Sequence, residues 1–447
     1  MKALRVSIAA GASAWIAFAA GATDLLEAYQ LSLQHDPRLQ AARYRYEAAK
    51  EAVPQARALL LPNIAVEAEY LDTEQDIRSS DNAVFAAGKT DFPTNRYGLT
   101  LSAPLFRMAD WHGLKQSHAE VALALAEFTA EEQELLRRVA ESYLAVLAAE
   151  DNVRFAEAEQ AAIERQRQLT LTRRSSGLAP RTDEFDANAR YALVVANVVE
   201  AQNQLDDARQ ALLETSGMLL TDLEPLRSEI PLERPNPLDV DQWVDLALRQ
   251  SPQVLAREQS LEVAQHEVRR QSAGRYPTLN LITRVDNRDT EGSLFGGGSE
   301  VETADVAIQL RVPVFSGGSQ GSNVREAALR VDETVEHVKL ERLVVARQAR
   351  SAYLGVLSGI ARTEALGESL VAQRSALDAK QRGYASGINT ALDVLDAERD
   401  LYLILRDHAQ ARYDYLLSTL RLKQAAGTLS VEDLVRINEA LAGASAN

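Results

Sequence analysis

Tyr143-Leu144-Ala145-Val146-Leu147 returns 210 residues later as Tyr353-Leu354-Gly355-Val356-Leu357. Ser176-Gly177-Leu178 returns at the same distance as Ser386-Gly387-Ile388. Further pairs keep this spacing, or one of 215 residues: Asp183 with Asp393, Asp186 with Asp396, Gly217 with Gly427, Asp36-Pro37 with Ser251-Pro252, and Pro62 with Pro277. Collinear matches at nearly one spacing predict that the chain is a duplication of one unit.

The segment between the two repeats is rich in proline, which cannot lie inside a helix. Its prolines are Pro225, Pro231, Pro235 and Pro237. We therefore expect a first repeat over 23–217, a linker over 218–240 and a second repeat over 241–427. A C-terminal helix and tail would occupy 428–447.

Each repeat reads as a helix, two strands and a long helical hairpin. The expected strands are about 62–72 and 97–106 in the first repeat, and about 277–287 and 304–315 in the second. The expected hairpins are about 110–216 and 319–426. Polar segments at 72–96 and 292–299 would join the strands of each pair.

The first helix of each hairpin is unusually long. The stretches 110–172 and 319–384 contain no proline, and each would measure about 95 Å at about 1.5 Å per residue. Apolar residues recur every three or four positions, which predicts a coiled-coil seam, and charges along the whole length predict a helix standing in water.

The expected strands alternate apolar and polar residues over about 9–11 positions. This pattern fits a membrane barrel with lipid outside and water inside, and it also fits a soluble sandwich. No apolar run after residue 22 is long enough for a membrane helix, so a spanning role would require a closed β-barrel. Four strands cannot close one, so several copies would have to contribute to it.

The N-terminus has the pattern of a signal peptide. Lys2 and Arg5 precede an apolar stretch from Val6 to Ala19, and small residues follow at 20–22. We expect residues 1–22 to direct export and to be removed.

Composition excludes several functions. The 48 basic and 64 acidic residues give a net charge of −16, and no basic cluster offers a nucleic-acid footprint. The absence of cysteine excludes disulfides, thiolate metal sites and an N-terminal lipidated Cys. The six histidines show no i, i+4 pair, so we expect no metal site and no cofactor.

No motif indicates an enzyme. Residues 83–90, which include Lys89, fit a loose phosphate-loop pattern, but they lie between two expected strands rather than between a strand and a helix. No Ser or Thr stands in a recognisable nucleophile motif.

Each hairpin turns at a glycine, in 175–180 and in 386–389. We expect Thr182 and Thr390 to cap the returning helices. Four acids follow the turns: Asp183, Asp186, Asp393 and Asp396. Acids in a first helical turn are favoured by the helix dipole, and in a symmetric oligomer they could instead form a ring of carboxylates that favours cations.

Residues 383–397, which read Gly-Tyr-Ala-Ser-Gly-Ile-Asn-Thr-Ala-Leu-Asp-Val-Leu-Asp-Ala, resemble the second helical tip of the TolC family. Leu60-Leu61-Pro62, residues 313–318 and residues 411–416 are similar to the same family in the same order. The resemblance covers essentially all of 23–440.

The resemblance implies a homotrimer with a twelve-stranded β-barrel in the bacterial outer membrane, embedded in lipid and continuous with an α-helical tunnel in the periplasm. A periplasmic adaptor would dock at the tips Gly177, Leu178, Ser386, Gly387 and Ile388. An inner-membrane pump, either an ABC exporter or a proton-driven pump, would engage the duct together with this adaptor. Thr182, Tyr384 and Asn389 would link neighbouring coils to hold the gate shut. Asp393 and Asp396, with Asp183 and Asp186, would ring the aperture.

One residue departs from the family pattern. The best-known member has an arginine where this chain has Asn389, and that arginine pairs with the acid matching Asp183. A neutral hydrogen bond is weaker than a charge-assisted one, so Asn389 predicts a gate held less tightly or by other contacts.

The expected function is a passive duct for type I protein secretion, or one shared between secretion and efflux. The alternative within this class is a dedicated channel of a multidrug or metal efflux pump. A periplasmic coiled-coil scaffold with a small soluble sandwich is the alternative from another class.

Overall fold

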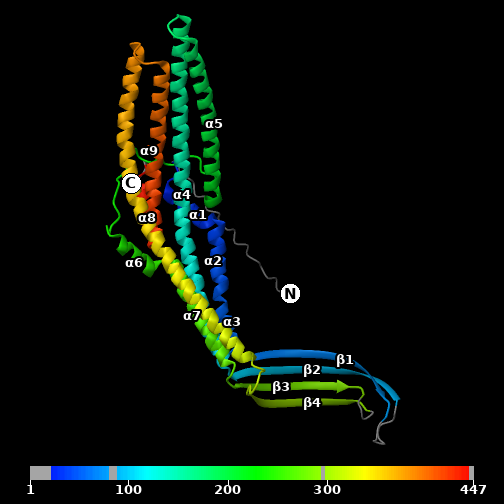
Figure 1. Cartoon of the computed structure of the whole chain (residues 1–447). Helices are drawn as coiled ribbons and strands as arrows, with labels where there is room; N and C mark the ends of the chain where they lie inside the picture. The colour runs from blue at the N-terminus through cyan, green and yellow to red at the C-terminus, as the bar shows by residue number, and fades with distance from the viewer. Residues whose placement is uncertain (1–21, 80–87, 293–296, 442–447) are drawn as a thin grey trace, which may run out of the picture.

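The computed structural model describes residues 22–79, 88–292 and 297–441. The molecule is elongated, with a long helical body, a curved four-stranded sheet at one end and two helical turns at the other (Figure 1). The predicted signal peptide, except residue 22, and residues 442–447 of the predicted tail lie outside the described residues.

The two halves run through similar elements in the same order, except that the second half has the single helix α7 where the first has α2 and α3. The first half holds α1 (Leu25–His35), α2 (Pro37–Lys50), α3 (Ala52–Ala58), β1 (Asn63–Ile77), β2 (Gly88–Phe106), α4 (Met108–Ser175) and α5 (Arg181–Ser216). The second holds α6 (Val240–Gln250), α7 (Pro252–Ala273), β3 (Thr278–Thr290), β4 (Ser299–Arg311), α8 (Ser319–Ala385) and α9 (Ala391–Ala425), followed by α10 (Val431–Glu439).

The first helix expected in each half is broken. α1 gives way to α2 at Asp36 and α6 gives way to α7 at Ser251, where ψ is 115° and 123°. Each of these residues precedes a proline, whose ring disfavours the helical conformation of the residue before it. Pro54 does not break α3, because it lies in the first turn, where a missing N–H costs little.

The returning helices α5 and α9 end against these breaks. Gly217 and Gly427 follow the two helices with φ of 71° and 72°, the left-handed conformation that glycine adopts without strain. A Cβ on Gly217 would lie 2.4 Å from Cβ of His35, and one on Gly427 would lie 2.4 Å from the carbonyl oxygen of Gln250. Glycine at these two positions therefore allows the ends of α5 and α9 to pack closely against the breaks in the shorter helices.

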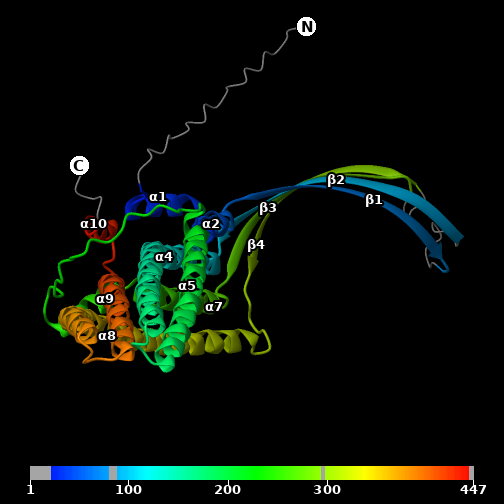
Figure 2. The same ribbon diagram turned by 90° about the horizontal axis from the view of Figure 1, so that it is seen from above.

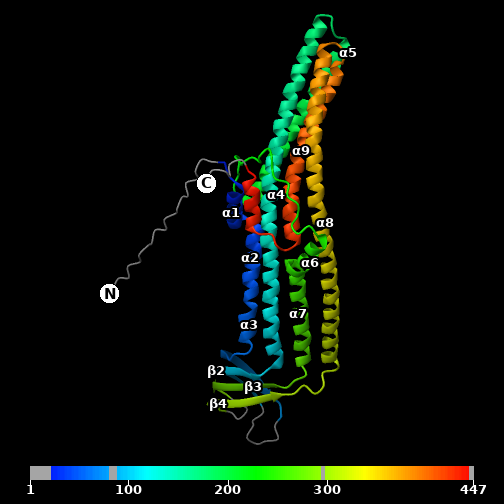
Figure 3. The ribbon, with the colours of Figure 1, turned by 90° about the vertical axis from the view of Figure 1, so that its left-hand side faces the viewer.

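The long helices α4 and α8 contain 68 and 67 residues, or about 100 Å each. α7 packs against both of them below the middle of the molecule, while α2 and α3 pack against α4 (Figure 3). None of the helices in the described ranges has both the length and the apolar composition of a membrane span.

The sheet is antiparallel, in the order β1-β2-β3-β4, so β1 and β4 are its two edges. The predicted loop at 72–96 is too long, because β1 continues to Ile77 and β2 begins at Gly88. Cross-strand pairing extends both strands through polar residues that sequence alternation did not mark, down to Ile77 opposite Gly88. β4 ends at Arg311, four residues before the expected end and ahead of Pro313, which lacks the N–H for a further ladder bond.

The register places the apolar faces of all four strands on one side of the sheet. Val66, Leu99, Val285 and Ala304 lie in one row, and Ile64, Leu101, Thr283 and Val306 lie in another. The row between them belongs to the other face and holds Ala65, Thr100, Arg284 and Asp305. The sheet curves away from the helices (Figure 2).

The main hydrophobic core lies at mid-length, in what we call the central belt: residues 23–35, the linker 218–240 and α10, packed on the long helices. The repeated tyrosines hold this belt. The Tyr143 hydroxyl donates to the carbonyl oxygen of Thr23 at 2.9 Å and accepts from the N–H of Glu224 at 3.1 Å. The Tyr353 hydroxyl donates to the carbonyl oxygen of Leu238. Burial raises the pKa of Tyr143 well above its usual range.

Candidate functional site at the helical tips

The two hairpin turns have the same hydrogen-bond pattern. The N–H groups of Gly177 and Leu178 donate to the carbonyl oxygens of Arg174 and Arg173 at 2.9 and 2.8 Å. At the second turn, Gly387 and Ile388 donate to Tyr384 and Gly383 at 3.2 and 2.8 Å. The glycines have φ of 73° and 79°, so each turn is a Schellman motif that requires glycine.

Both turns present an apolar side chain to solvent. Leu178 is 76% exposed and Ile388 is 83% exposed. Ser386 and both turn glycines are exposed as well. The predicted docking residues are therefore all accessible within the protomer at the end farthest from the sheet.

The two returning helices begin differently. Thr390 caps α9 as predicted, in a capping box with Asp393: the N–H of Asp393 donates to Thr390 Oγ1 at 3.2 Å, and the N–H of Thr390 donates to Asp393 Oδ2 at 2.8 Å. Thr182 does not cap α5, because Pro180 occupies the cap position and the helix begins at Arg181. Pro180 offers no side-chain acceptor, so this end of α5 has no side-chain cap.

The capping box stabilises the ionised form of Asp393. Hydrogen bonds from the Thr390 hydroxyl and backbone, together with one from the Asn389 side chain, lower the pKa of Asp393 below its ordinary value. The Asn389 side chain is therefore hydrogen-bonded to Asp393 within this protomer. No hydrogen bond or ion pair joins it to Asp183 among the described residues.

The predicted gate links do not meet one another within the protomer. Thr182 Oγ1 donates to Oδ1 of its neighbour Asp183 at 3.5 Å, and Asp186 is exposed. Tyr384 is buried beneath Arg173 of the first hairpin, whose guanidinium carbon lies 4.3 Å from the ring centre. The Tyr384 hydroxyl has no hydrogen-bond partner in the described part of the chain.

Asp396 joins the two hairpins. Its Oδ1 accepts from Nη2 of Arg190, on α5, at 2.8 Å, and Nη1 of Arg399 lies 3.5 Å from the same oxygen. Sequence reasoning missed Arg190. The available signal was its position seven residues after Asp183, which places both on one side of α5.

The sequence matches a known family over most of its length. The profile of the family described as "Outer membrane efflux protein" matches residues 28–218 and 243–428. The chain belongs to this family. It is therefore an outer-membrane channel protein, and not an enzyme.

Relatives and solved structures agree with this assignment. The channel is 30% identical to the outer membrane protein TolC of Vibrio cholerae over 443 residues, 99% of each chain. It is 31% identical to the alkaline protease secretion protein AprF of Pseudomonas aeruginosa, over 94% of this chain and 86% of that one. Its fold matches the Campylobacter jejuni CmeC outer membrane channel with a TM-score of 0.78 over 99% of both chains, at 16% identity.

Two buried acids lie behind the tips of the channel. Glu159 on α4 and Glu398 on α9 are 2% and 6% exposed, and each has a carboxylate oxygen with no hydrogen bond among the described residues. Burial raises the pKa of both. Arg406 lies 3.6 Å from Glu159 and partly compensates its charge.

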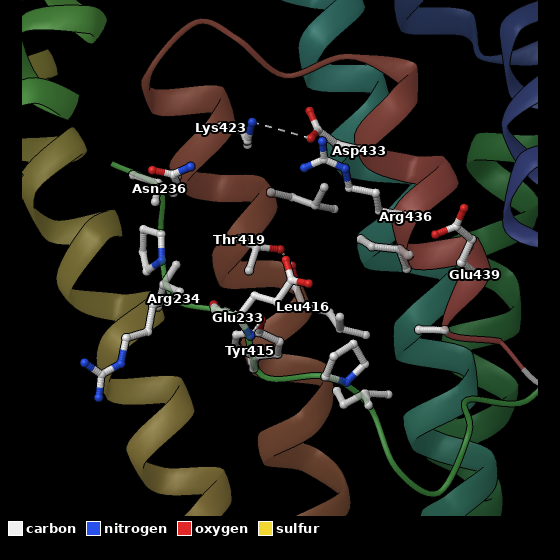
Figure 4. Close-up of a pocket in the computed structure, with 18 of the residues that line it drawn as sticks. Glu233, Arg234, Asn236, Tyr415, Leu416, Thr419, Lys423, Asp433, Arg436 and Glu439 are labelled. Atoms are coloured by element: carbon white, nitrogen blue, oxygen red, sulfur yellow. Dashed lines mark hydrogen bonds and ion pairs between the residues drawn. The ribbon is translucent and has the colours of Figure 1, made fainter. Parts of the chain in front are cut away.

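A cavity of about 630 Å³ lies in the central belt, between the linker, α9 and α10 (Figure 4). Tyr415 and Leu416 form part of its wall, and charges of both signs surround it, including Lys423 and Asp433 at 3.8 Å. The Tyr415 hydroxyl accepts from the N–H of Glu233 at 2.8 Å, so the cavity lies where the linker is tied to α9. It is far from the tips and shares no residue with them.

The described residues contain no cluster of three or more His, Asp or Glu side chains that could bind a metal ion. Lys89 lies on β2 opposite Asp76, and its Nζ is 3.6 Å from Glu74 Oε1. Residues 83–87 of the phosphate-loop-like stretch lie outside the described residues.

Proposed function

We propose that three copies of this channel protein assemble into an exit duct, with one closed β-barrel in the outer membrane and one α-helical tunnel in the periplasm. The observation that carries the proposal is the curved four-stranded sheet with two unpaired edges. Four strands cannot close a barrel on their own. In an antiparallel sheet of four, however, β4 of one copy runs in the direction needed to pair antiparallel with β1 of the next copy. Three copies supply twelve strands.

The register supports lipid on one face of that barrel. Exposed apolar side chains are concentrated on one face, among them Val66, Leu99, Val306, Ile308 and Leu310. The other face holds Glu67, Arg284, Asp286 and Asp305, which suit a water-filled interior.

Unpartnered apolar side chains along the helices support the tunnel. On α8, Leu340, Leu343 and Leu354 are exposed at the spacing of one helical stripe, and on α5 Leu193 and Val199 are exposed. Such stripes in a protomer suit packing against neighbouring copies.

The tips would dock a periplasmic adaptor, which connects the duct to an inner-membrane pump. Exposed Leu178 and Ile388, held on rigid glycine turns at equivalent places, support this assignment. The pump is proposed to be an ABC exporter of a type I secretion system, or one of several pumps sharing the duct. The 31% identity to a protease secretion protein favours secretion, and the efflux family favours the alternative, a dedicated channel of a multidrug or metal efflux pump.

In the trimer, Asp393 and Asp396 would ring the aperture, with Asp183 and Asp186 nearby, and Thr182, Tyr384 and Asn389 would lie between coils. Co(III) hexammine added from the tip side should block the conductance of such a ring. Block that is unchanged in Asp393→Ala plus Asp396→Ala would reject the ring.

The assembly is tested in isolated membranes. A trimer in the outer-membrane fraction should resist carbonate extraction and run as a heat-modifiable band. Release by carbonate would favour the coiled-coil scaffold instead.

The partner is tested by cross-linking, since the chain has no cysteine of its own. Ser386→Cys at the tip should capture an adaptor with a short bifunctional reagent in intact cells, while the exposed control Ser316→Cys at the sheet end should not. An adaptor of an ATP-driven exporter means type I secretion, and one of a proton-driven pump means efflux. Capturing both means a shared duct, and capturing neither would contradict docking at the tips.

A further inference from the structure

The two hairpins are joined only weakly by apolar contacts near the tips. The buried apolar cluster that spans both hairpins there consists of Ile163 on α4, Ala187 and Val194 on α5, and Leu395 on α9. This cluster is small beside the core of the central belt, and apolar stabilisation scales with the area removed from water. Polar contacts therefore carry a larger share of the hairpin joint near the tips than at mid-length.

Arg190 and Asp396 lie at the edge of this small cluster. Arg190 is between Ala187 and Val194 on α5, and Asp396 follows Leu395 on α9. The Arg190 side chain is 17% exposed and the Asp396 side chain 37%, so their 2.8 Å contact is partly shielded from water. Among the described residues this is the ion pair that connects α5 directly with α9.

The surrounding charges keep the pair in place. Arg399 adds a second cation to Asp396 at 3.5 Å, and Arg406 of α9 reaches the buried Glu159 of α4 at 3.6 Å. Within this short stretch of the joint, Asp396 therefore contacts an arginine from each hairpin, and Glu159 of the first hairpin contacts Arg406 of the second. Separating the hairpins here would leave the partly buried Asp396 without the cation from α5.

We propose that Arg190 is the residue that holds the gate of this duct closed, by tying Asp396 of the second hairpin to the first. The inference rests on the proposed trimeric duct. It assigns the charged closing contact to α5 and α9, in a chain whose Asn389 offers only a neutral side chain and is already bonded to Asp393. It also means that Asp396 contributes less negative charge to the aperture than Asp393, because two arginines compensate Asp396.

The test is single-channel recording of the purified full-length protein in planar bilayers. Arg190→Gln and Asp396→Asn should each raise the open fraction by about tenfold, since three weak ion pairs are lost per trimer. The charge-reversed double variant, Arg190→Asp with Asp396→Arg, should return the open fraction close to the wild-type value. The matched control is Arg209→Gln, whose partner Glu150 at 3.0 Å lies in the same hairpin, and it should change nothing.

A cross-link supplies a second measurement that does not depend on weakening the fold. Arg190→Cys with Asp396→Cys, joined by a short thiol-reactive linker, should hold the channel closed, whereas each single cysteine variant treated alike should not. Trimer yield on a heat-modifiable gel shows that each variant assembles.

The outcomes separate the two proposals. Wild-type protein that forms no channel would overturn the duct and this inference with it. Wild-type channels whose open fraction is the same in Arg190→Gln and Asp396→Asn would overturn the role of Arg190 and leave the duct standing.

Discussion

The guanidinium carbon of Arg173 lies 4.3 Å from the centre of the Tyr384 ring, and Nη1 of Arg173 donates to the Tyr384 carbonyl oxygen at 3.3 Å. These contacts join α4 of the first hairpin to the last turn of α8 in the second. Tyr384 therefore acts within the protomer through its ring and its backbone, while its hydroxyl is unbonded in the described residues.

Arg173→Ala should loosen the tips, because it removes a cation–π contact worth about 1 kcal/mol in each protomer. Tyr384→Phe keeps the ring and should leave the open fraction unchanged in planar-bilayer recordings. If Tyr384→Phe raises the open fraction as much as Arg173→Ala does, the Tyr384 hydroxyl bonds to a neighbouring copy.

Ile308→Arg should reduce the amount of assembled trimer in the outer membrane. Ile308 pairs with Leu281 on the apolar face, and an arginine near the bilayer midplane costs about 2–4 kcal/mol. Gln309→Arg, one residue along and on the polar face, is the control and should assemble normally. Equal yields of heat-modifiable trimer for both variants would contradict the assignment of the lipid face.

Alkaline pH should weaken the central belt. The pKa of Tyr143 and that of Tyr413 are raised by burial above the ordinary value of about 10, so their contribution to stability is complete below about pH 10 and is lost as the pH rises further. Each tyrosine adds a slope of up to about 1.4 kcal/mol per pH unit. Denaturant midpoints between pH 8 and 11 should fall, and Tyr143→Phe should show a shallower fall from a lower starting value. If the denaturant midpoint of Tyr143→Phe falls with pH as steeply as that of the wild type, ionisation of Tyr143 is not the cause of the fall.

Glu398→Gln should stabilise the channel at neutral pH by about 1 kcal/mol. Burial, opposed by a hydrogen bond from Gln381, raises the pKa of Glu398, so the stability linked to this group is present at acid pH and is lost as the pH rises. The gain in thermal midpoint should be largest near pH 8 and vanish near pH 4. A gain of equal size at both pH values would show that ionisation of Glu398 is not its cause.

Elements set by local residues were predictable. Gly177 and Gly387 mark the tips because each turn needs a left-handed residue, and Thr390 begins α9 because its hydroxyl accepts from the N–H three residues later. The start of β2 was predicted wrongly, since its first residues are polar and form a strand through pairing with β1. The prediction that Thr182 caps α5 was also wrong, because Pro180 sets the helix start before it.

Local patterns along the chain were enough to predict the order of elements, the two long helices and the glycine turn that follows each, because these features depend on residues a few positions apart. Which distant residues meet depends on the packing of whole elements, and this came from the three-dimensional structure. Arg190 and Asp396 are 206 positions apart, and neither residue's neighbours indicate the other. The same holds for the register that places Val66, Leu99 and Val285 on one face of the sheet. Such contacts follow from how whole hairpins and strands pack, and a pattern of short period along the chain carries no information about that packing.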